Sequence, residues 1–166
     1  MFLIWGLLSL QTAYAWNMSS GGYGTTVSYR TSAGNHRTHV GAGGWFQRCR
    51  DRNEMQSCWQ GGVSLSTNGQ KIPGGTMRTT VVRPTISMGY FMGSQPTKVG
   101  FSAGAGAQVI SGGVNGDVVL VQPGGYGMIS LQKPLSDDWL LWGSNGYFMR
   151  AWGVDVDISV GVGKRW

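Results

Sequence analysis

The sequence has little charge and few features of a helical protein. Asp, Glu, Lys and Arg make up 12% of the 166 residues, about half of the roughly 25% that is usual in soluble domains. No segment carries an apolar stripe at i, i+3, i+4 and i+7 over three turns. Glycine accounts for 29 residues, and it is unfavourable inside helices by about 1 kcal/mol relative to alanine. These absences argue against a domain built from long helices.

The residues that metal binding, nucleotide binding and hydrolytic catalysis usually require are few or absent. With two histidines and two cysteines in the chain, we expect neither a metal site nor a cofactor, since His36 and His39 would lie on opposite faces of an extended segment. No G-x-S-x-G element is present, and Gly104-Ala-Gly106 lacks the strand-to-helix setting of a nucleotide-binding loop. The net charge of +6 is scattered apart from Arg48, Arg50 and Arg52, which does not favour nucleic-acid binding.

The N-terminus predicts export from the cytoplasm. Residues 1–10 are apolar, and residues 11–15 end in Ala13-x-Ala15, the small-residue pattern of a signal-peptidase site. The apolar run is shorter than the roughly 20 residues of a membrane-spanning helix, and no Lys or Arg precedes it. We therefore expect a signal peptide over residues 1–15 and a single β-barrel domain over residues 16–166.

The last thirteen residues have the period of a strand. Val154, Val156, Ile158, Val160 and Val162 fall on one face, while Asp155, Asp157, Ser159, Gly161 and Gly163 fall on the other. The chain then stops on Trp166. Similar alternation recurs along the chain in residues 25–31, 36–47, 59–66, 82–92, 98–109 and 117–132, followed by a seventh segment from residue 139 and an eighth within residues 147–166. We expect residues 68–69 and 73–75 to lie in a loop, and Pro123 to Gly125 to mark a bulge or break.

The chain resembles the small outer-membrane barrels of Gram-negative bacteria, a class that includes OmpX-like, Ail/Lom-like and PagP-like proteins. The resemblance rests on the leader, the alternating segments and the amphipathic last strand with its terminal aromatic residue. It implies an all-β fold, an antiparallel up-and-down barrel of about eight strands, with localisation in the outer membrane. Val160, Val162 and Trp166 would then form the signal read by the barrel assembly machinery.

The inward face of such a barrel is predicted to hold glycines and paired charges. An eight-stranded barrel is just wide enough to be filled by side chains. Glycines on this face would leave room for Trp45 and for charged residues that must pair, because an unpaired buried charge is costly; these are Arg30, Arg37, Arg83, Asp155 and Asp157. This arrangement disfavours a diffusion pore.

Cys49 and Cys58 flank a short polar stretch, and we expect a disulfide between them, as in other exported chains with two nearby cysteines. In an eight-stranded barrel with both termini in the periplasm, this cysteine loop would be the second connection. Residues 33–35, 71–77, 111–116 and 143–146, the last with a hairpin tip at residues 144–146, would form the outward connections.

The predicted function is a structural or surface-binding role, such as adhesion, carried by those outward loops, with outer-membrane lipids or lipopolysaccharide as partners. Two alternatives remain open from the sequence. A secreted β-sandwich, such as an adhesin or pilus subunit, would also carry a leader, one disulfide and an alternating last strand. A lipid-modifying enzyme would use His36 or His39 with Ser28, Ser32 or Ser64.

Deletion of Trp166 tests the assembly signal. We expect the shortened protein to be exported but not inserted, so that it loses the gel shift that a folded barrel shows when it is not heated. A normal shift in the deletion variant would contradict the role of Trp166.

Overall fold

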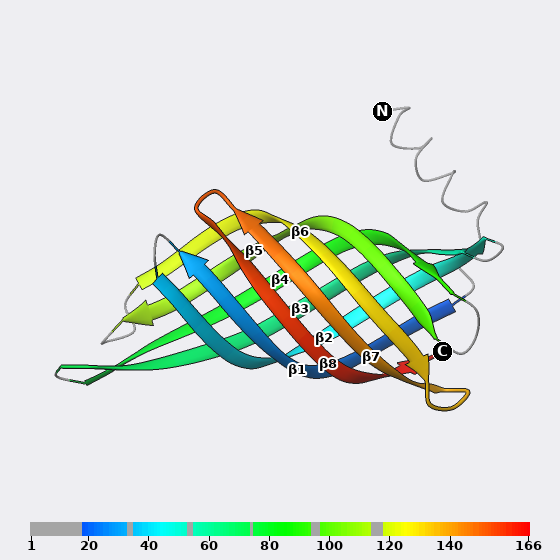
Figure 1. Ribbon diagram of the computed structural model, residues 1–166, viewed down its shortest axis with the longest axis horizontal. Coiled ribbons are helices and arrows are strands. Elements are labelled where there is room, and N and C mark those ends of the chain that lie inside the picture. The colour runs from blue at the N-terminus through cyan, green and yellow to red at the C-terminus, as the bar shows by residue number, and fades with distance from the viewer. Residues whose placement is uncertain (1–17, 33–34, 53–54, 74, 94–96, 114–117) are drawn as a thin grey trace, which may run out of the picture.

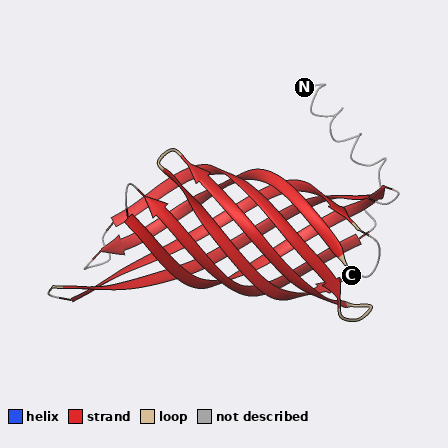
Figure 2. Ribbon diagram, in the orientation of Figure 1, coloured by secondary structure: helices blue, strands red, loops and turns tan. Residues whose placement is uncertain are grey.

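The computed structural model describes residues 18–32, 35–52, 55–73, 75–93, 97–113 and 118–166. Eight strands follow one another along the chain: β1 (Met18–Ser32), β2 (Asn35–Arg52), β3 (Met55–Ile72), β4 (Gly75–Met92), β5 (Lys98–Gly113), β6 (Val118–Pro134), β7 (Trp139–Arg150) and β8 (Gly153–Arg165). Each pairs antiparallel with its neighbours, and β8 pairs with β1 to close the barrel (Figures 1 and 2). Within these described residues, no helix is long and apolar enough to cross a membrane.

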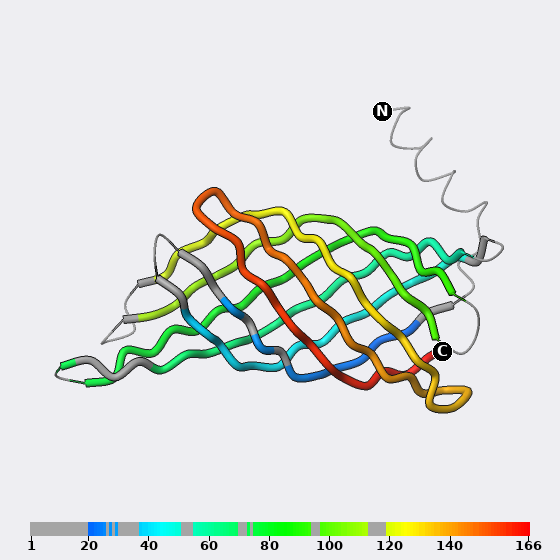
Figure 3. Tube along the Cα trace, viewed as in Figure 1, coloured from blue at the N-terminus to red at the C-terminus, as the bar shows by residue number. Residues whose placement is uncertain are grey.

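The closed ring confirms the predicted eight-stranded up-and-down barrel and is incompatible with a two-sheet sandwich. The register has a stagger that can be followed once around the wall, from Ser20 through Gln47, Gln60, Ser87, Gly104, Tyr126, Phe148 and Asp155 to Arg30. One circuit therefore advances ten residues along β1. A stagger of this kind requires strands tilted by roughly 35–45° to the barrel axis, and the oblique strands are evident along the tube in Figure 3.

The two ends of the barrel differ. The start of β1 and the C-terminus lie at one end, called here the terminal end, together with the β2–β3, β4–β5 and β6–β7 connections (Figure 1). The opposite end, called the hairpin end, carries the other four connections. There the β3–β4 hairpin stays paired as far as Ile72 and Gly75, and it projects well beyond the β7–β8 hairpin, which ends at Arg150 and Gly153 (Figure 1).

Three local turn predictions were wrong. Residues 144–146, read as a hairpin tip, lie inside β7 and pair with both β6 and β8. The turn comes later, at residues 151–152, just before Gly153, whose φ of 152° favours glycine. Residues 68–69 belong to β3, and Pro123 lies within β6 opposite Ala107. In each case, pairing with neighbouring strands outweighed a short turn signal.

Glycines allow the closing strands to approach closely. Gly24 on β1 lies opposite Gly161 on β8, and a Cβ atom at either position would collide with the backbone of the other strand. Gly22 and Gly163, two residues along, also face each other, and a Cβ atom at Gly22 would collide with the β8 backbone. The pairing of β1 with β8, called here the seam, therefore requires inward positions without side chains on both strands.

Substitution of one seam glycine tests this condition. We expect Gly161→Val to prevent the seam from forming, because no side-chain rotation moves a Cβ away from backbone atoms. The variant should lose the gel shift of the unheated barrel and unfold at a much lower urea concentration. Gly127→Ala is the matched control, since a Cβ at Gly127 meets nothing within 4 Å; equal loss in both variants would refute the steric explanation.

Candidate functional site

The lumen contains a buried charge cluster made by Arg83, Arg150, Asp155, Asp157 and Gln108. Arg83 Nη2 donates to Asp155 Oδ2 at 2.8 Å, and its Nη1 pairs with Asp157. Arg150 Nη2 donates to the second oxygen of Asp155 at 2.7 Å. The Asp155 side chain is 0% exposed and that of Arg83 is 4% exposed. Two arginines and two aspartates cancel in formal charge, as burial requires.

The Gln108 amide and a phenyl ring complete this cluster. The amide of Gln108 satisfies both neighbours when it is oriented with Nε2 donating to Asp155 Oδ2 at 3.1 Å and Oε1 accepting from Arg150 Nε at 2.9 Å. The Arg83 guanidinium also lies over the Phe148 ring, 4.8 Å from its centroid, in a cation–π arrangement. Gln108 and Phe148 thus both shield the charged groups from solvent and interact with them directly.

Strand geometry explains how these residues meet. Asp155 and Asp157 are two residues apart on β8, so both point inward. Arg83 lies on β4, which faces β8 across the barrel, with three strands between them on either side. The two ion pairs of Arg83 therefore join opposite walls of the lumen and connect residues more than 70 positions apart in sequence.

The prediction of which charged residues pair in the lumen was partly correct. Arg83, Asp155 and Asp157 pair as expected. Arg150 was missed, because the predicted hairpin tip at residues 144–146 broke the alternation that would have placed it inward. Arg37 is half-buried near the hairpin end, and the side chain of Arg30 lies outside the described residues.

A second layer fills the lumen nearer the terminal end. The indoles of Trp45 and Trp142 stack with ring centroids 5.5 Å apart, and Met128 and Leu140 pack beside them. Three glutamines form an amide chain: Gln60 Nε2 donates to Gln47 Oε1 at 3.1 Å, and Gln132 Nε2 donates to the same oxygen at 2.8 Å. This layer combines packed aromatic rings with satisfied amides.

The disulfide lies beyond this layer. Cys49 and Cys58 are directly opposed on β2 and β3 and are joined as expected, with Phe91 packed against them. Both cysteines are buried, with exposed fractions of 3% for Cys49 and 0% for Cys58. The cysteines thus belong to paired strands with inward side chains, and the pairing continues beyond them to Arg52 and Met55, so that the connection is shorter than the loop predicted between the two cysteines.

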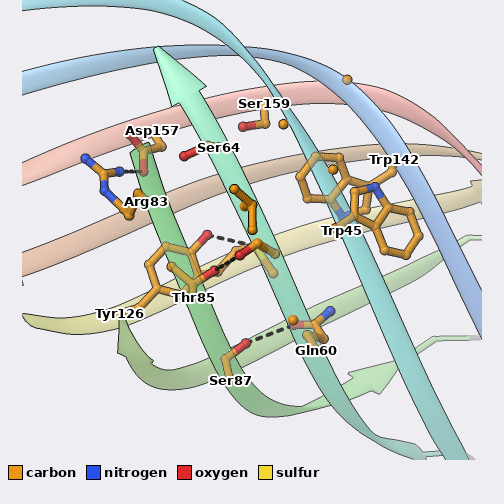
Figure 4. A pocket seen from close by; sticks show the side chains of 17 residues that line it. Trp45, Gln60, Ser64, Arg83, Thr85, Ser87, Tyr126, Trp142, Asp157 and Ser159 are labelled. Carbon is orange, nitrogen blue, oxygen red and sulfur yellow. Dashed lines mark hydrogen bonds and ion pairs between the residues drawn. The ribbon is translucent and has the colours of Figure 1, made fainter. Parts of the chain in front are cut away.

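A cavity of about 80 Å³ separates the charge cluster from the aromatic layer (Figure 4). Arg83 and Asp157 line one side, Trp45, Trp142 and Met128 line the other, and Ser64, Thr85 and Ser159 contribute hydroxyls. Asp157 Oδ1, Arg83 Nε and Trp45 Nε1 are buried without a hydrogen-bond partner in the described part of the chain. A cavity of this size has room for several waters, which could hydrogen-bond these three atoms.

The two candidate catalytic side chains that the structure describes, His39 and Ser64, do not lie on the outer wall. His39 is 1% exposed and points into the lumen, and Ser64 lines the cavity. The side chains of Ser28, Ser32 and His36 lie outside the described residues. Over the described residues, no three His, Cys, Asp or Glu side chains are grouped so as to hold a metal ion.

The outer wall is apolar and ringed by aromatic residues. Large apolar side chains are exposed on every strand, among them Val27, Val40, Leu65, Ile86, Val121, Ile129, Met149 and Ile158. Toward the terminal end they give way to aromatic residues: Phe46, Trp59, Tyr90, Phe101, Trp139 and Trp166. Trp166 stacks on Phe46 with centroids 6.5 Å apart, so the terminal residue packs against β2.

Neutralising one member of the charge cluster tests its role in stability. Asp155→Asn would leave two buried guanidinium groups with a single carboxylate, and we expect a loss of about 3 kcal/mol in the free energy of unfolding, measured by urea titration in detergent. Asp137→Asn, in the exposed β6–β7 connection, is the control and should change stability by less than about 0.5 kcal/mol. Equal stability of the two variants would contradict the cluster's role.

Comparison with solved structures identifies the architecture. Ail, the attachment invasion locus protein of Yersinia pestis, superposes with a TM-score of 0.70 and 14% identity, covering 90% of this chain and 98% of Ail; that crystal structure contains the heparin analogue sucrose octasulfate. Neisserial surface protein A gives a TM-score of 0.65 at 12% identity, covering 89% of this chain and 98% of that protein. No family model matches the sequence, and no curated protein matches it closely enough to count as a relative. The likeness is one of fold: this chain is a small up-and-down barrel with the architecture of Ail and the Neisserial surface protein.

Proposed function

We propose that this protein is an outer-membrane barrel that binds polyanionic ligands at the cell surface through its hairpin end. The observation that carries the membrane placement is the outer wall, whose exposed apolar side chains run continuously around a closed sheet. At a rise of about 3.3 Å per residue and a tilt of about 40°, the stretch from Val154 to Val162 covers roughly 20 Å along the axis. That length is close to the apolar band of about 25 Å in membrane barrels.

A filled lumen supports a binding role over a diffusion pore. The charge cluster, the aromatic layer and the disulfide with Phe91 occupy successive levels of the interior. The cavity between the first two levels is lined by members of both. Function is then carried by what the barrel displays at its ends.

The proposed ligand-binding surface lies at the hairpin end of the barrel. The β3–β4 hairpin projects there (Figure 1), and its outward positions beyond the apolar band are polar, including Thr67, Thr76 and Arg78. Basic residues gather at this end: Arg78 is exposed, Arg37 is half-buried, and Arg30 and Lys71 lie on the same ends of their strands. The aspartates described near this end, Asp155 and Asp157, are neutralised inside the lumen, while Asp117 lies outside the described residues.

An excess of basic residues at a projecting end favours anionic ligands, such as lipopolysaccharide phosphates or sulfated polysaccharides. The presence of a heparin analogue in the Ail crystal structure supports this ligand class for a barrel of the same fold. Insertion through the assembly machinery, with Val160, Val162 and Trp166 as its signal, is part of the same proposal.

Binding of sucrose octasulfate to the purified barrel tests the ligand class. We expect Arg37→Gln with Arg78→Gln to weaken binding at least about fivefold and to reduce its salt dependence, because two of the cations that attract the ligand are lost. Lys98→Gln with Arg165→Gln removes the same charge at the terminal end and serves as the control. No binding by the wild type, or equal weakening by both pairs, would refute the proposed ligand class.

Epitope insertion tests which end faces outward. A short epitope placed after Gly74, between β3 and β4, should be labelled on intact cells, while one placed after Asn53, between β2 and β3, should not. The reverse result would invert the orientation, and labelling of neither would argue against surface display.

A further inference from the structure

Basic side chains are unevenly distributed around the outer wall at the terminal end. Lys133 on β6, Lys164 on β8 and Arg48 on β2 are all exposed. Each lies two residues beyond the last apolar outward residue of its strand, namely Leu131, Val162 and Phe46. The three therefore occupy the boundary just outside the apolar band; they are called here the basic half-rim.

The barrel register brings the half-rim together from distant parts of the sequence. β6, β7, β8, β1 and β2 are consecutive around the wall, so one basic residue stands on every second strand. Neighbouring strands are about 4.8 Å apart, which spaces the cations by about 10 Å. Between them, Trp139 on β7 pairs with Lys164, and Ser19 on β1 pairs with Arg48.

In the other half of the same rim the outward residues are uncharged, and Lys98 at the start of β5 stands at an inward position. The outward residues of β3, β4 and β5 at this level are Trp59, Tyr90 and Val99, with Met92 beyond them. An apolar band bordered by cations on one side and by aromatic or aliphatic residues on the other is an asymmetric surface. Such asymmetry points to a specific partner for the charged side.

The half-rim cations are available to a partner. In the described part of the chain, Arg48, Lys133 and Lys164 form no ion pair with a carboxylate; the ion pairs there involve Arg83 and Arg150. Asp137 and Asp138 are exposed in the β6–β7 connection farther from the band, and the side chains of Asp51 and Glu54 lie outside the described residues. The Asp138 backbone oxygen accepts from the Arg165 amide at 2.7 Å, which fixes this connection against β8.

We propose that the basic half-rim binds the phosphate headgroups of anionic phospholipids in the leaflet at the terminal end. Lysine and arginine just outside an apolar band lie at headgroup depth, where they attract anionic lipids, and the adjacent indoles of Trp139 and Trp166 are typical of that interface. This inference rests on the proposed membrane placement. It adds a lipid partner for the end opposite to the polyanion-binding surface.

Reconstitution tests the proposal. The barrel would be inserted into vesicles of phosphatidylcholine with a minority of phosphatidylglycerol, extracted, and analysed for retained lipid by native mass spectrometry. We expect the wild type to retain phosphatidylglycerol preferentially over phosphatidylcholine. In the variant Arg48→Gln/Lys133→Gln/Lys164→Gln, the ratio of the two retained lipids should fall at least about tenfold. The charge-conserving variant Arg48→Lys/Lys133→Arg/Lys164→Arg should keep it, as should Arg37→Gln/Arg78→Gln at the hairpin end.

Three results would contradict the proposed lipid binding by the half-rim. These are no preference in a wild type that inserts, an undiminished preference in the triple glutamine variant, or an equal loss in the hairpin-end variant. The gel shift of the unheated protein, recorded first for each sample, separates these outcomes from failure to insert, which would refute the membrane placement and the half-rim together.

Discussion

Closure of the sheet between β1 and β8 is the constraint on which the remaining structure depends. Without that seam, each end strand would present unpaired backbone groups, which neither water-free lipid nor a stable sheet tolerates. Closure with a stagger of ten residues tilts every strand and sets the width of the lumen. It also requires bare inner faces at Gly24 and Gly161, where the two backbones approach most closely. The glycine content of the chain therefore has a steric cause at the seam.

The narrow lumen then determines what the inward side chains do. Arginine and aspartate are removed from bulk water inside a barrel of this width, so they neutralise one another across it. Arg83 and Asp155 link opposite walls, and Gln108 and Phe148 occupy the remaining sides of the same groups. The aromatic layer and the disulfide fill the levels toward the terminal end. The result is a rigid interior that supports display at the ends.

The outside of the barrel follows a different rule, because its residues face the surroundings. Apolar side chains cover the middle, aromatic residues gather toward the terminal end, and charges lie beyond. Basic residues occur at both ends but in different settings: Arg78 lies on a projecting hairpin, whereas Lys133 and Lys164 lie beside the apolar band. These two settings are the basis for the two proposed anion-binding surfaces, one for soluble polyanions and the other for lipid headgroups.

The sequence by itself determined which side chains share a face, since alternation is a property of any strand. It therefore placed Asp155, Asp157 and Arg83 inward and predicted eight strands and the Cys49–Cys58 bond. Only the tertiary structure decided that Arg83 meets β8 across the lumen, that Arg150 joins it, and that the half-rim unites β6, β8 and β2. Register and closure fix those distances, and no local pattern records them. The same physics explains the error at residues 144–146: an Asn-Gly pair favours a turn locally, but hydrogen bonding to two neighbouring strands outweighs that preference.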